Sequence, residues 1–195
     1  EVLCMSYAFD DEDVYTWQPT YPFPKRVRDH KGLIYAHNAA FERLIFWYVL
    51  QINFQLEQFY CTATQARANC APGSLEDVGR FAGASMKKDY RGAQLIRALC
   101  VPPFKEDAAL MIEMVQYCEQ DVRAMRAVSQ SLRPLSDEEL EDYHVNEKIN
   151  DRGVLVDVPL ASAAISYAAI ELADIQSIVR TVTNGAITSV RSPKM

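Results

Sequence analysis

Two short segments of the chain carry side chains that could do chemistry together, and Tyr117 and Asp121 form the first. They lie four residues apart in a run whose apolar periodicity predicts a helix, so the phenol and the carboxylate share one helix face. At the edge of a cleft, the carboxylate can hold a divalent cation and the phenol can orient an attacking water. The spacing alone is weak, because about 0.7 such pairs are expected by chance in a chain of 195 residues with 10 tyrosines and 13 aspartates. A solvated helix edge is the ordinary alternative.

The second segment is His-Asn-Ala-Ala-Phe-Glu at 37–42, directly after a predicted buried strand. The carboxyl ends of strands are where α/β proteins bind ligands. Asn38 could touch a nucleotide, Phe41 could stack on a base, and Glu42 could reach a metal directly or through water. Each also has an ordinary explanation: Asn38 as a helix cap, Phe41 as a core residue, and Glu42 as a charge near the positive end of a helix.

The alternation of short apolar runs with helical periodicity predicts an α/β domain, in which helices flank a mixed sheet. Strands are expected at 2–9, 14–17, 32–36 and 59–61, the first two forming a hairpin around an acidic turn at 10–13. The expected helices are 39–51 capped by Asn38, 62–69 capped by Thr62, one from Ser74 to a stop at Gly83, 92–100, and 107–132. The last helix carries an apolar stripe of Met111, Val115, Cys118, Val122, Met125 and Leu132.

Beyond Pro134 the composition changes. An acidic helix is expected from Ser136 to about Asn150, followed by a turn and a short strand at 154–156. A long Ala- and Ile-rich helix is then expected from Pro159 to a stop at Asn184-Gly185.

The net charge of −6 is concentrated in one segment. Residues 134–157 hold eight acidic side chains against Lys148 and Arg152, so they account for all of it and the remainder is neutral. A neutral body offers no cationic surface for gripping duplex DNA. It is compatible with a site for a few nucleotides of a single-stranded end, because such sites also use stacking and metal ions.

The cysteines and the hydropathy predict a cytoplasmic protein. The five cysteines are odd in number and form no Cys-x-x-Cys pair, which favours reduced thiols over a disulfide framework or a zinc site. No apolar run approaches the roughly 20 residues that a membrane helix needs, and the chain has no signal-peptide opening. No membrane partner is therefore expected.

Both chemical segments resemble motifs of one known family. Ile-Tyr-Ala-His-Asn-Ala-Ala-Phe-Glu-Arg at 34–43 resembles the second exonuclease motif in the proofreading domains of family A DNA polymerases, phage polymerases above all. Tyr-Cys-Glu-Gln-Asp at 117–121 resembles the third motif of the tyrosine-bearing DEDD class. Residues 149–157 are similar to the segment through which these proteins pass from exonuclease to polymerase. The resemblance covers nearly the whole chain.

The resemblance implies an RNase H-like 3′–5′ exonuclease fold at 1–133 and a mostly helical junction toward a polymerase domain of the same parent chain at 134–195. It implies a single-stranded 3′ end of DNA as substrate, two ions of Mg²⁺ or Mn²⁺ as cofactors, and the host cytoplasm as the location if the protein is phage-encoded. Asp121 would be a direct metal ligand, Tyr117 would orient the attacking water, and Glu42 would hold the second metal. The residues implied to contact the substrate are His37, Asn38, Phe41 and Lys88.

The first motif of the family, Asp-x-Glu on an opening strand, has no match at its expected place. It belongs upstream of a segment like 1–7, inside the sheet, and its carboxylates supply most of the charge that holds the metals. Asp10-x-Glu12 is the other candidate, but its position between two strands favours a hairpin tip. The alternatives are a catalytically dead scaffold or single-strand-binding module beside a polymerase, and a ribonuclease of the same superfamily.

Overall fold

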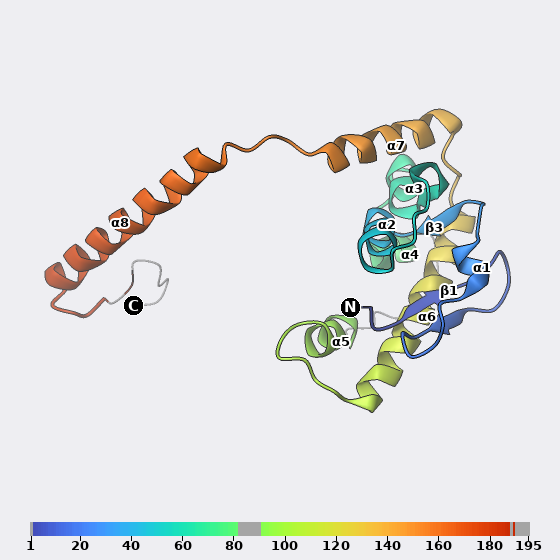
Figure 1. The fold of residues 1–195 in the computed structure, drawn as a ribbon, viewed down its shortest axis with the longest axis horizontal. Coiled ribbons are helices and arrows are strands. Elements are labelled where there is room, and N and C mark those ends of the chain that lie inside the picture. The colour runs from blue at the N-terminus through green and yellow to red at the C-terminus, as the bar shows by residue number, and fades with distance from the viewer. Residues whose placement is uncertain (1, 82–90, 188, 190–195) are drawn as a thin grey trace. The chain divides into compact units, whose positions relative to one another are not determined.

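The computed structural model describes residues 2–81, 91–187 and 189. The chain divides into two compact units, Glu1–Asn150 and Asp151–Met195. The first unit contains short strands and seven α-helices among its described residues, and the second contains one long helix (Figure 1). The architecture is mixed α and β, and it is mostly helical.

The strands of the first unit form two small sheets. β1 (Met5–Tyr7) and β2 (Tyr15–Trp17) pair antiparallel, with Met5 opposite Trp17. β3 (Ile34–Ala36) and β4 (Phe59–Cys61) pair parallel, with Ile34 opposite Phe59. All four predicted strands are therefore present, although 2–9 and 32–36 are shorter than expected. Among the described residues they make two pairs, not the single mixed sheet that the sequence predicted.

Asn38 and Thr62 do not cap the helices that follow them, which corrects two predictions. α2 (Ala40–Leu44) begins after Ala39, and Asn38 has a φ of +67°. α2 then runs into a π-helical turn at Ile45–Val49. Thr62 is the first residue of α3 (Thr62–Ala68), and its hydroxyl donates a hydrogen bond to the Ala36 carbonyl at 3.3 Å. The side chain thus joins α3 to β3, and does not cap α3.

The other helix starts follow from capping chemistry. Ser74 precedes α4 (Leu75–Phe81), and its hydroxyl accepts from the Asp77 backbone N–H at 3.1 Å. Asp107 precedes α6 (Ala108–Ser131) and accepts from the N–H groups of Ala109 and Leu110. The predicted stop at Gly83 lies outside the described residues. The helices that complete this part are α1 (Lys25–Arg28), a 3₁₀ turn at Leu56–Gln58 and α5 (Arg91–Leu99).

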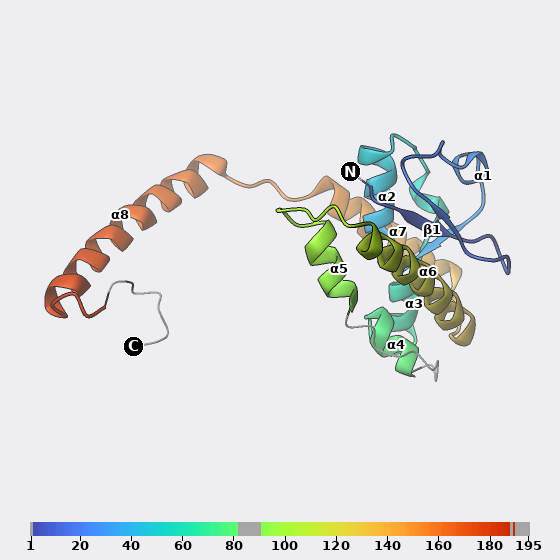
Figure 2. The same cartoon turned by 90° about the horizontal axis from the view of Figure 1, so that it is seen from below.

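α6 is the central element of the first unit. It contacts β1, β2, α3, α4 and α5 (Figures 1 and 2). Met5 of β1 and Ile34 of β3 pack against one apolar cluster built around Phe46, Phe54 and Phe59, so the two small sheets share a core. Two smaller clusters, one around Val78 and Val128 and one around Leu95 and Met114, lie against α6.

The acidic helix α7 (Asp137–Arg152) packs on the rest of the first unit. Tyr143, His144 and Glu147 are its buried residues. The His144 Nε2 lies 2.9 Å from the Phe59 carbonyl, and the Leu135 N–H donates to the Tyr60 hydroxyl at 2.7 Å. The structural division therefore falls after Asn150, whereas the sequence placed the start of the junction at Pro134.

The second unit consists mainly of α8 (Val158–Val182), none of whose residues is buried. The predicted start and stop are confirmed: Asp157 accepts from the Leu160 N–H, and Asn184 and Gly185 adopt positive φ values. The predicted strand at 154–156 is wrong, because these residues form no strand and are exposed.

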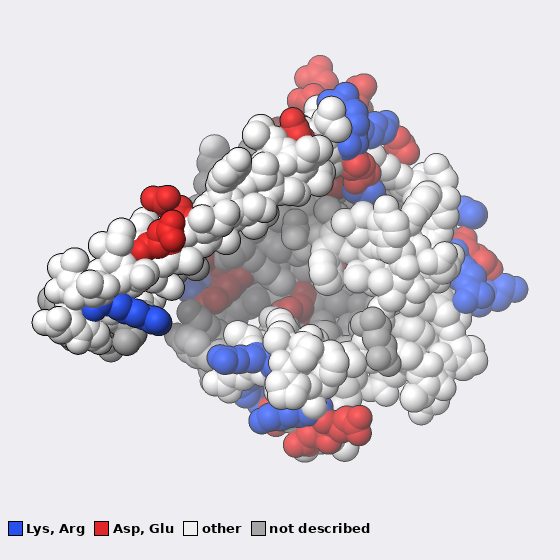
Figure 3. All heavy atoms as spheres, turned by 60° about the vertical axis from the view of Figure 1, so that its left-hand side comes forward, with Lys and Arg blue, Asp and Glu red and all other residues white. Residues whose placement is uncertain are grey.

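α8 is long and apolar enough to cross a membrane, judged by length and composition. The expectation that no segment has this property was therefore wrong. Figure 3 shows the largely uncharged surface of this helix. Its charged residues are Glu171, Asp174 and Arg180. Glu171 and Asp174 lie near its middle, where a charge in lipid costs about 2.5–3.5 kcal/mol or more. The composition is also that of a helix covered by other protein.

Candidate functional site

His37 follows β3 and is held by protein groups on both sides of its ring. Its Nδ1 lies 3.0 Å from the Thr62 hydroxyl, and its Nε2 lies 2.9 Å from the Gly73 carbonyl. Burial lowers the pKa of His37, against the raising effect of the hydrogen bond to Gly73. Because both nitrogens are engaged, the predicted direct contact with substrate requires breaking one of these bonds. The geometry makes His37 a brace between β3, α3 and the loop before α4.

Asn38 and Phe41 face solvent. Asn38 adopts the left-handed backbone conformation that asparagine tolerates better than most residues. The side chain of Phe41 is 64% exposed, which excludes the alternative that it belongs to the core of this unit. An exposed aromatic ring in the first turn of α2 has a free face on which a base can stack.

Glu42 lies beside Phe41 in the first turn of α2, but its carboxyl group is turned into the protein. One carboxyl oxygen, Oε2, is buried and has no hydrogen-bond partner. Desolvation raises the pKa of Glu42 to about 7. Tyr143 of α7 is coupled to Glu42 electrostatically: the pKa of Tyr143 is raised mainly by burial, and the charge of Glu42 adds to this effect. A buried carboxyl oxygen without a protein donor fits a proton or a cation.

Tyr117 and Asp121 lie one turn apart on α6, as predicted. Tyr117 packs against the cluster around Leu95 and Met114. Its ring also covers Gly92 of α5: a Cβ at position 92 would lie 2.6 Å from Cε2 and Cζ of Tyr117. A glycine therefore makes room for the tyrosine ring.

The register of α6 against the first hairpin is fixed by side-chain bonds. The Thr16 hydroxyl of β2 donates to Glu119 at 3.1 Å and lies 2.8 Å from the Ser6 hydroxyl of β1. One residue before Glu119, the Cys118 sulfur lies 3.7 Å from that of Cys4. The turn of α6 that carries Tyr117 and Asp121 is therefore held directly beside β1.

Asp10-x-Glu12 forms the tip of the hairpin, as the sequence favoured. Asp10 has a φ of +43°, and the Glu12 N–H donates to the Phe9 carbonyl at 2.8 Å. The Glu12 carboxylate receives two hydrogen bonds from Arg26, at 2.6 and 2.7 Å, and these bonds lower the pKa of Glu12. A carboxylate neutralised by a bidentate arginine is a poor candidate for a metal ligand.

The structure thus brings the predicted residues together as two groups, one after β3 and one on α6. Lys88 lies outside the described residues. Within the described part of the chain, no three His, Cys, Asp or Glu side chains gather closely enough to hold a metal ion. Glu42 has an oxygen that fits a cation, but the described residues do not complete a metal site.

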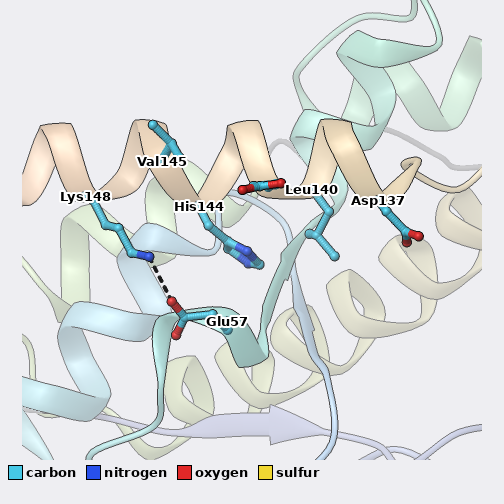
Figure 4. Close-up of a pocket in the computed structure, with 7 residues that line it drawn as sticks. Glu57, Asp137, Leu140, His144, Val145 and Lys148 are labelled. Atoms are coloured by element: carbon cyan, nitrogen blue, oxygen red, sulfur yellow. Dashed lines mark ion pairs between the residues drawn. The ribbon is translucent and has the colours of Figure 1, made fainter.

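A surface hollow beside α7 contains none of the predicted residues. It is lined by Glu57, Asp137, Leu140, Glu141, His144, Val145 and Lys148. Figure 4 shows Lys148 reaching across it to Glu57, and the two charged groups lie 2.9 Å apart. This ion pair is exposed, and the hollow has no feature that indicates chemistry.

The sequence missed three residues or pairs that support the two groups: Gly92, the Arg43–Glu147 ion pair and the Cys4–Cys118 contact. Each joins segments that are far apart in the chain. Cys118 lies on the apolar stripe predicted at 107–132, which gives its helix face but does not identify its partner.

Comparison with known proteins gives one informative match. No family model and no solved structure matches the chain. A DNA polymerase of Bacillus phage SP02 is 32% identical in an alignment of 189 positions that spans 85% of this chain and 29% of the polymerase. The chain therefore spans less than a third of this relative's length, and over most of its own length it is similar to part of a phage DNA polymerase.

Proposed function

We propose that this chain is the 3′–5′ exonuclease part of a phage DNA polymerase, which removes 3′-terminal nucleotides from DNA. The similarity to the SP02 phage polymerase supports a polymerase-associated role. The observation that carries the finer proposal is Glu42, whose buried carboxyl oxygen lacks a protein partner directly after β3. It lies where the family resemblance puts a metal-binding acid, in a domain that also presents Tyr117 and Asp121 on one face of α6.

The metal site of this proposal needs acidic residues that the described part of the chain does not supply. The Asp-x-Glu strand of the family would provide them from upstream in the parent protein. Two features support a place for such a strand: β1 and β3 each pair on one side only among the described residues, and Met5 and Ile34 pack on one core. Mg²⁺ or Mn²⁺ bound there would stabilise the attacking and leaving oxygens of phosphodiester hydrolysis.

The residues of this chain take distinct roles in the proposal. Asp121 and Glu42 contribute two of the carboxylates, and Tyr117 orients water toward the scissile phosphate. Phe41 offers its exposed ring to the terminal base, and Asn38 contacts the same nucleotide. His37 positions the end of β3 through Thr62 and Gly73. Lys88 contacts a phosphate of the substrate.

In this proposal the polymerase domain belongs to the same parent chain, and the enzyme acts in the host cytoplasm.

A catalytically silent scaffold is the second candidate. It is favoured by the absence of a group of three metal-binding side chains among the described residues. In that case the exonuclease fold would bind single-stranded DNA beside the polymerase domain, or would only support the polymerase domain structurally.

The test compares the parent polymerase, including its upstream region, with its Asp121→Ala and Asp137→Ala variants. Asp137 is an exposed acid on α7 and serves as the matched control. Each protein is incubated with a 5′-labelled single strand of DNA or RNA and with Mg²⁺, Mn²⁺ or EDTA. We expect metal-dependent shortening of DNA from its 3′ end, reduced about 10²-fold or more by Asp121→Ala and unchanged by Asp137→Ala.

The other outcomes separate the alternatives. A folded, polymerising parent that binds the single strand without shortening it supports the scaffold. Faster shortening of RNA than of DNA supports a ribonuclease of the same superfamily. The 195-residue chain by itself is expected to be inactive. Metal-dependent activity of this chain would overturn the need for an upstream strand.

A further inference from the structure

Cys4 and Cys118 lie close together although 114 residues separate them in the sequence, and their sulfur atoms are 3.7 Å apart. Cys4 lies just before β1, and Cys118 lies on α6 between Tyr117 and Asp121. A disulfide bond is about 2.05 Å long, so the sulfurs need to approach by less than about 2 Å. Both side chains are half-buried, so they are shielded in part but not sealed from small oxidants.

The packing around the two thiols keeps them together. Both belong to the apolar cluster built around Leu95, Leu99 and Met114. The neighbouring bond from Thr16 to Glu119 holds the same turn of α6 against the hairpin. The hydrogen bond with Cys118 lowers the pKa of Cys4, although burial opposes this effect. Cys4 is therefore the thiol more easily ionised, and the thiolate is the nucleophile in thiol oxidation.

We propose that Cys4 and Cys118 are a reversible oxidation site, at which a peroxide converts two thiols into a disulfide that ties β1 to α6. The Cys4 thiolate attacks one oxygen of hydrogen peroxide, the O–O bond breaks, and a sulfenic acid and hydroxide form. The Cys118 sulfur then attacks the Cys4 sulfur and releases water. Two thiols lose two electrons and two protons in total, and the peroxide is reduced to two molecules of water. A dithiol reductant reverses the step.

This inference is independent of the proposed nuclease activity, because it rests on the contact between two segments of the first unit. The sequence does not indicate this pair, because the five cysteines are odd in number and Cys4 and Cys118 are far apart in the chain. In a reducing cytoplasm the pair remains as thiols. Under peroxide stress the disulfide would fix the turn of α6 that carries Tyr117 and Asp121 against β1.

The experiment oxidises the folded 195-residue chain with hydrogen peroxide, quenches it with an alkylating agent in denaturant, and maps the peptides by mass spectrometry. The matched background is Cys70→Ser with Cys100→Ser, which removes the two exposed thiols and leaves Cys61 buried. We expect one intramolecular disulfide between Cys4 and Cys118, the loss of two thiols, and recovery of both with dithiothreitol. We also expect slower amide hydrogen exchange in 108–131 after oxidation.

Three controls make the result decisive. In the Cys4→Ser variant, Cys118 should stay reduced. In the Cys118→Ser variant, the sulfenic acid should accumulate at Cys4. In the unsubstituted chain, Cys70 reports whether the peroxide dose is sufficient. Oxidation of Cys70 while Cys4 and Cys118 stay reduced would overturn the proposal. So would a disulfide that maps to Cys61 in the matched background.

Discussion

Gly92 is the residue on which the position of Tyr117 depends most directly. Alanine at this position would bring its Cβ within 2.6 Å of the tyrosine ring, so the ring must move. We predict that Gly92→Ala destabilises the chain by about 1–3 kcal/mol, the usual cost of overpacking. In a Tyr117→Ala background the clash is absent, and the same change should stabilise α5 by up to about 1 kcal/mol, because alanine favours helix over glycine.

Urea unfolding of the four proteins of this cycle measures the reversal of sign. Equal destabilisation by Gly92→Ala in both backgrounds would mean that the tyrosine ring is not what the glycine accommodates. In the parent enzyme, Gly92→Ala should also slow any exonuclease activity that depends on Tyr117, without a matching loss of polymerase activity.

Glu42 makes stability depend on pH. Its pKa is about 7 in the folded chain and 4.5 as a reference, so the folded state binds a proton more tightly than the unfolded state. The unfolding free energy contributed by this proton is complete below pH 4.5 and is lost as pH rises through 7. At about 1.4 kcal/mol per pKa unit, the loss amounts to about 3 kcal/mol.

We therefore predict that Glu42→Gln is less sensitive to pH between 4.5 and 7.5 than the unsubstituted chain, and more stable at pH 7.5. Urea unfolding in EDTA at several pH values measures this difference. Glu57→Gln is the contrasting control, because the hydrogen bond from Lys148 lowers the pKa of Glu57. An identical pH slope in the unsubstituted chain and Glu42→Gln would contradict the buried environment of Glu42.

At the scale of elements, the sequence predicted most helices and all four strands because their signals are local. Asp107 before α6 and Asn184-Gly185 after α8 are capping residues whose chemistry acts within one turn. The strand predicted at 154–156 failed because an apolar, β-branched run records only a tendency, and no strand among the described residues pairs with this exposed segment.

The docking of α7 could not be predicted, because its contacts are made with distant segments. The sequence predicted an acidic helix here, but it did not show that Tyr143, His144 and Glu147 are buried. Glu147 forms an ion pair with Arg43 of α2, with 3.1 Å between the charged groups and only 8% of the glutamate side chain exposed. A charge count along the chain cannot distinguish this glutamate from its exposed neighbours.

We predict that Glu147→Leu destabilises the chain by about 3–5 kcal/mol, because it leaves the Arg43 charge buried without this carboxylate. The double variant Arg43→Met with Glu147→Leu should lose less than the sum of the two single variants. Thermal or urea unfolding of the cycle measures the coupling. Lys148→Ala, which removes the exposed pair with Glu57 on the same helix, should cost less than about 1 kcal/mol. Additive losses for Arg43 and Glu147 would show that the two side chains do not stabilise each other.

For the whole molecule, the two compact units differ in what holds them together. The three apolar clusters of the chain's described part all lie within 1–150. Residues 151–187 contain none, and most of their large apolar side chains are exposed. These include Val154, Leu155, Val156, Leu160, Ile165, Tyr167, Ile170 and Ile178. An apolar surface of this kind is typical of a segment that other protein or lipid covers.

We predict that a chain of residues 1–150 keeps the cooperative unfolding transition of the first unit. Compared with the 195-residue chain, it should bind less of an apolar dye and form fewer oligomers. Calorimetry, dye fluorescence and light scattering after size exclusion measure the three effects. The double variant Ile165→Gln with Ile178→Gln in the 195-residue chain should also form fewer oligomers, although α8 is still present.

Flotation with phosphatidylcholine vesicles tests whether lipid or other protein covers the apolar surface of α8. We expect no binding to the vesicles, because Glu171 and Asp174 lie near the middle of α8. Flotation of the 195-residue chain, but not of 1–150, would identify lipid as the cover. Loss of folding in 1–150 would mean instead that the second unit contributes to the core of the first.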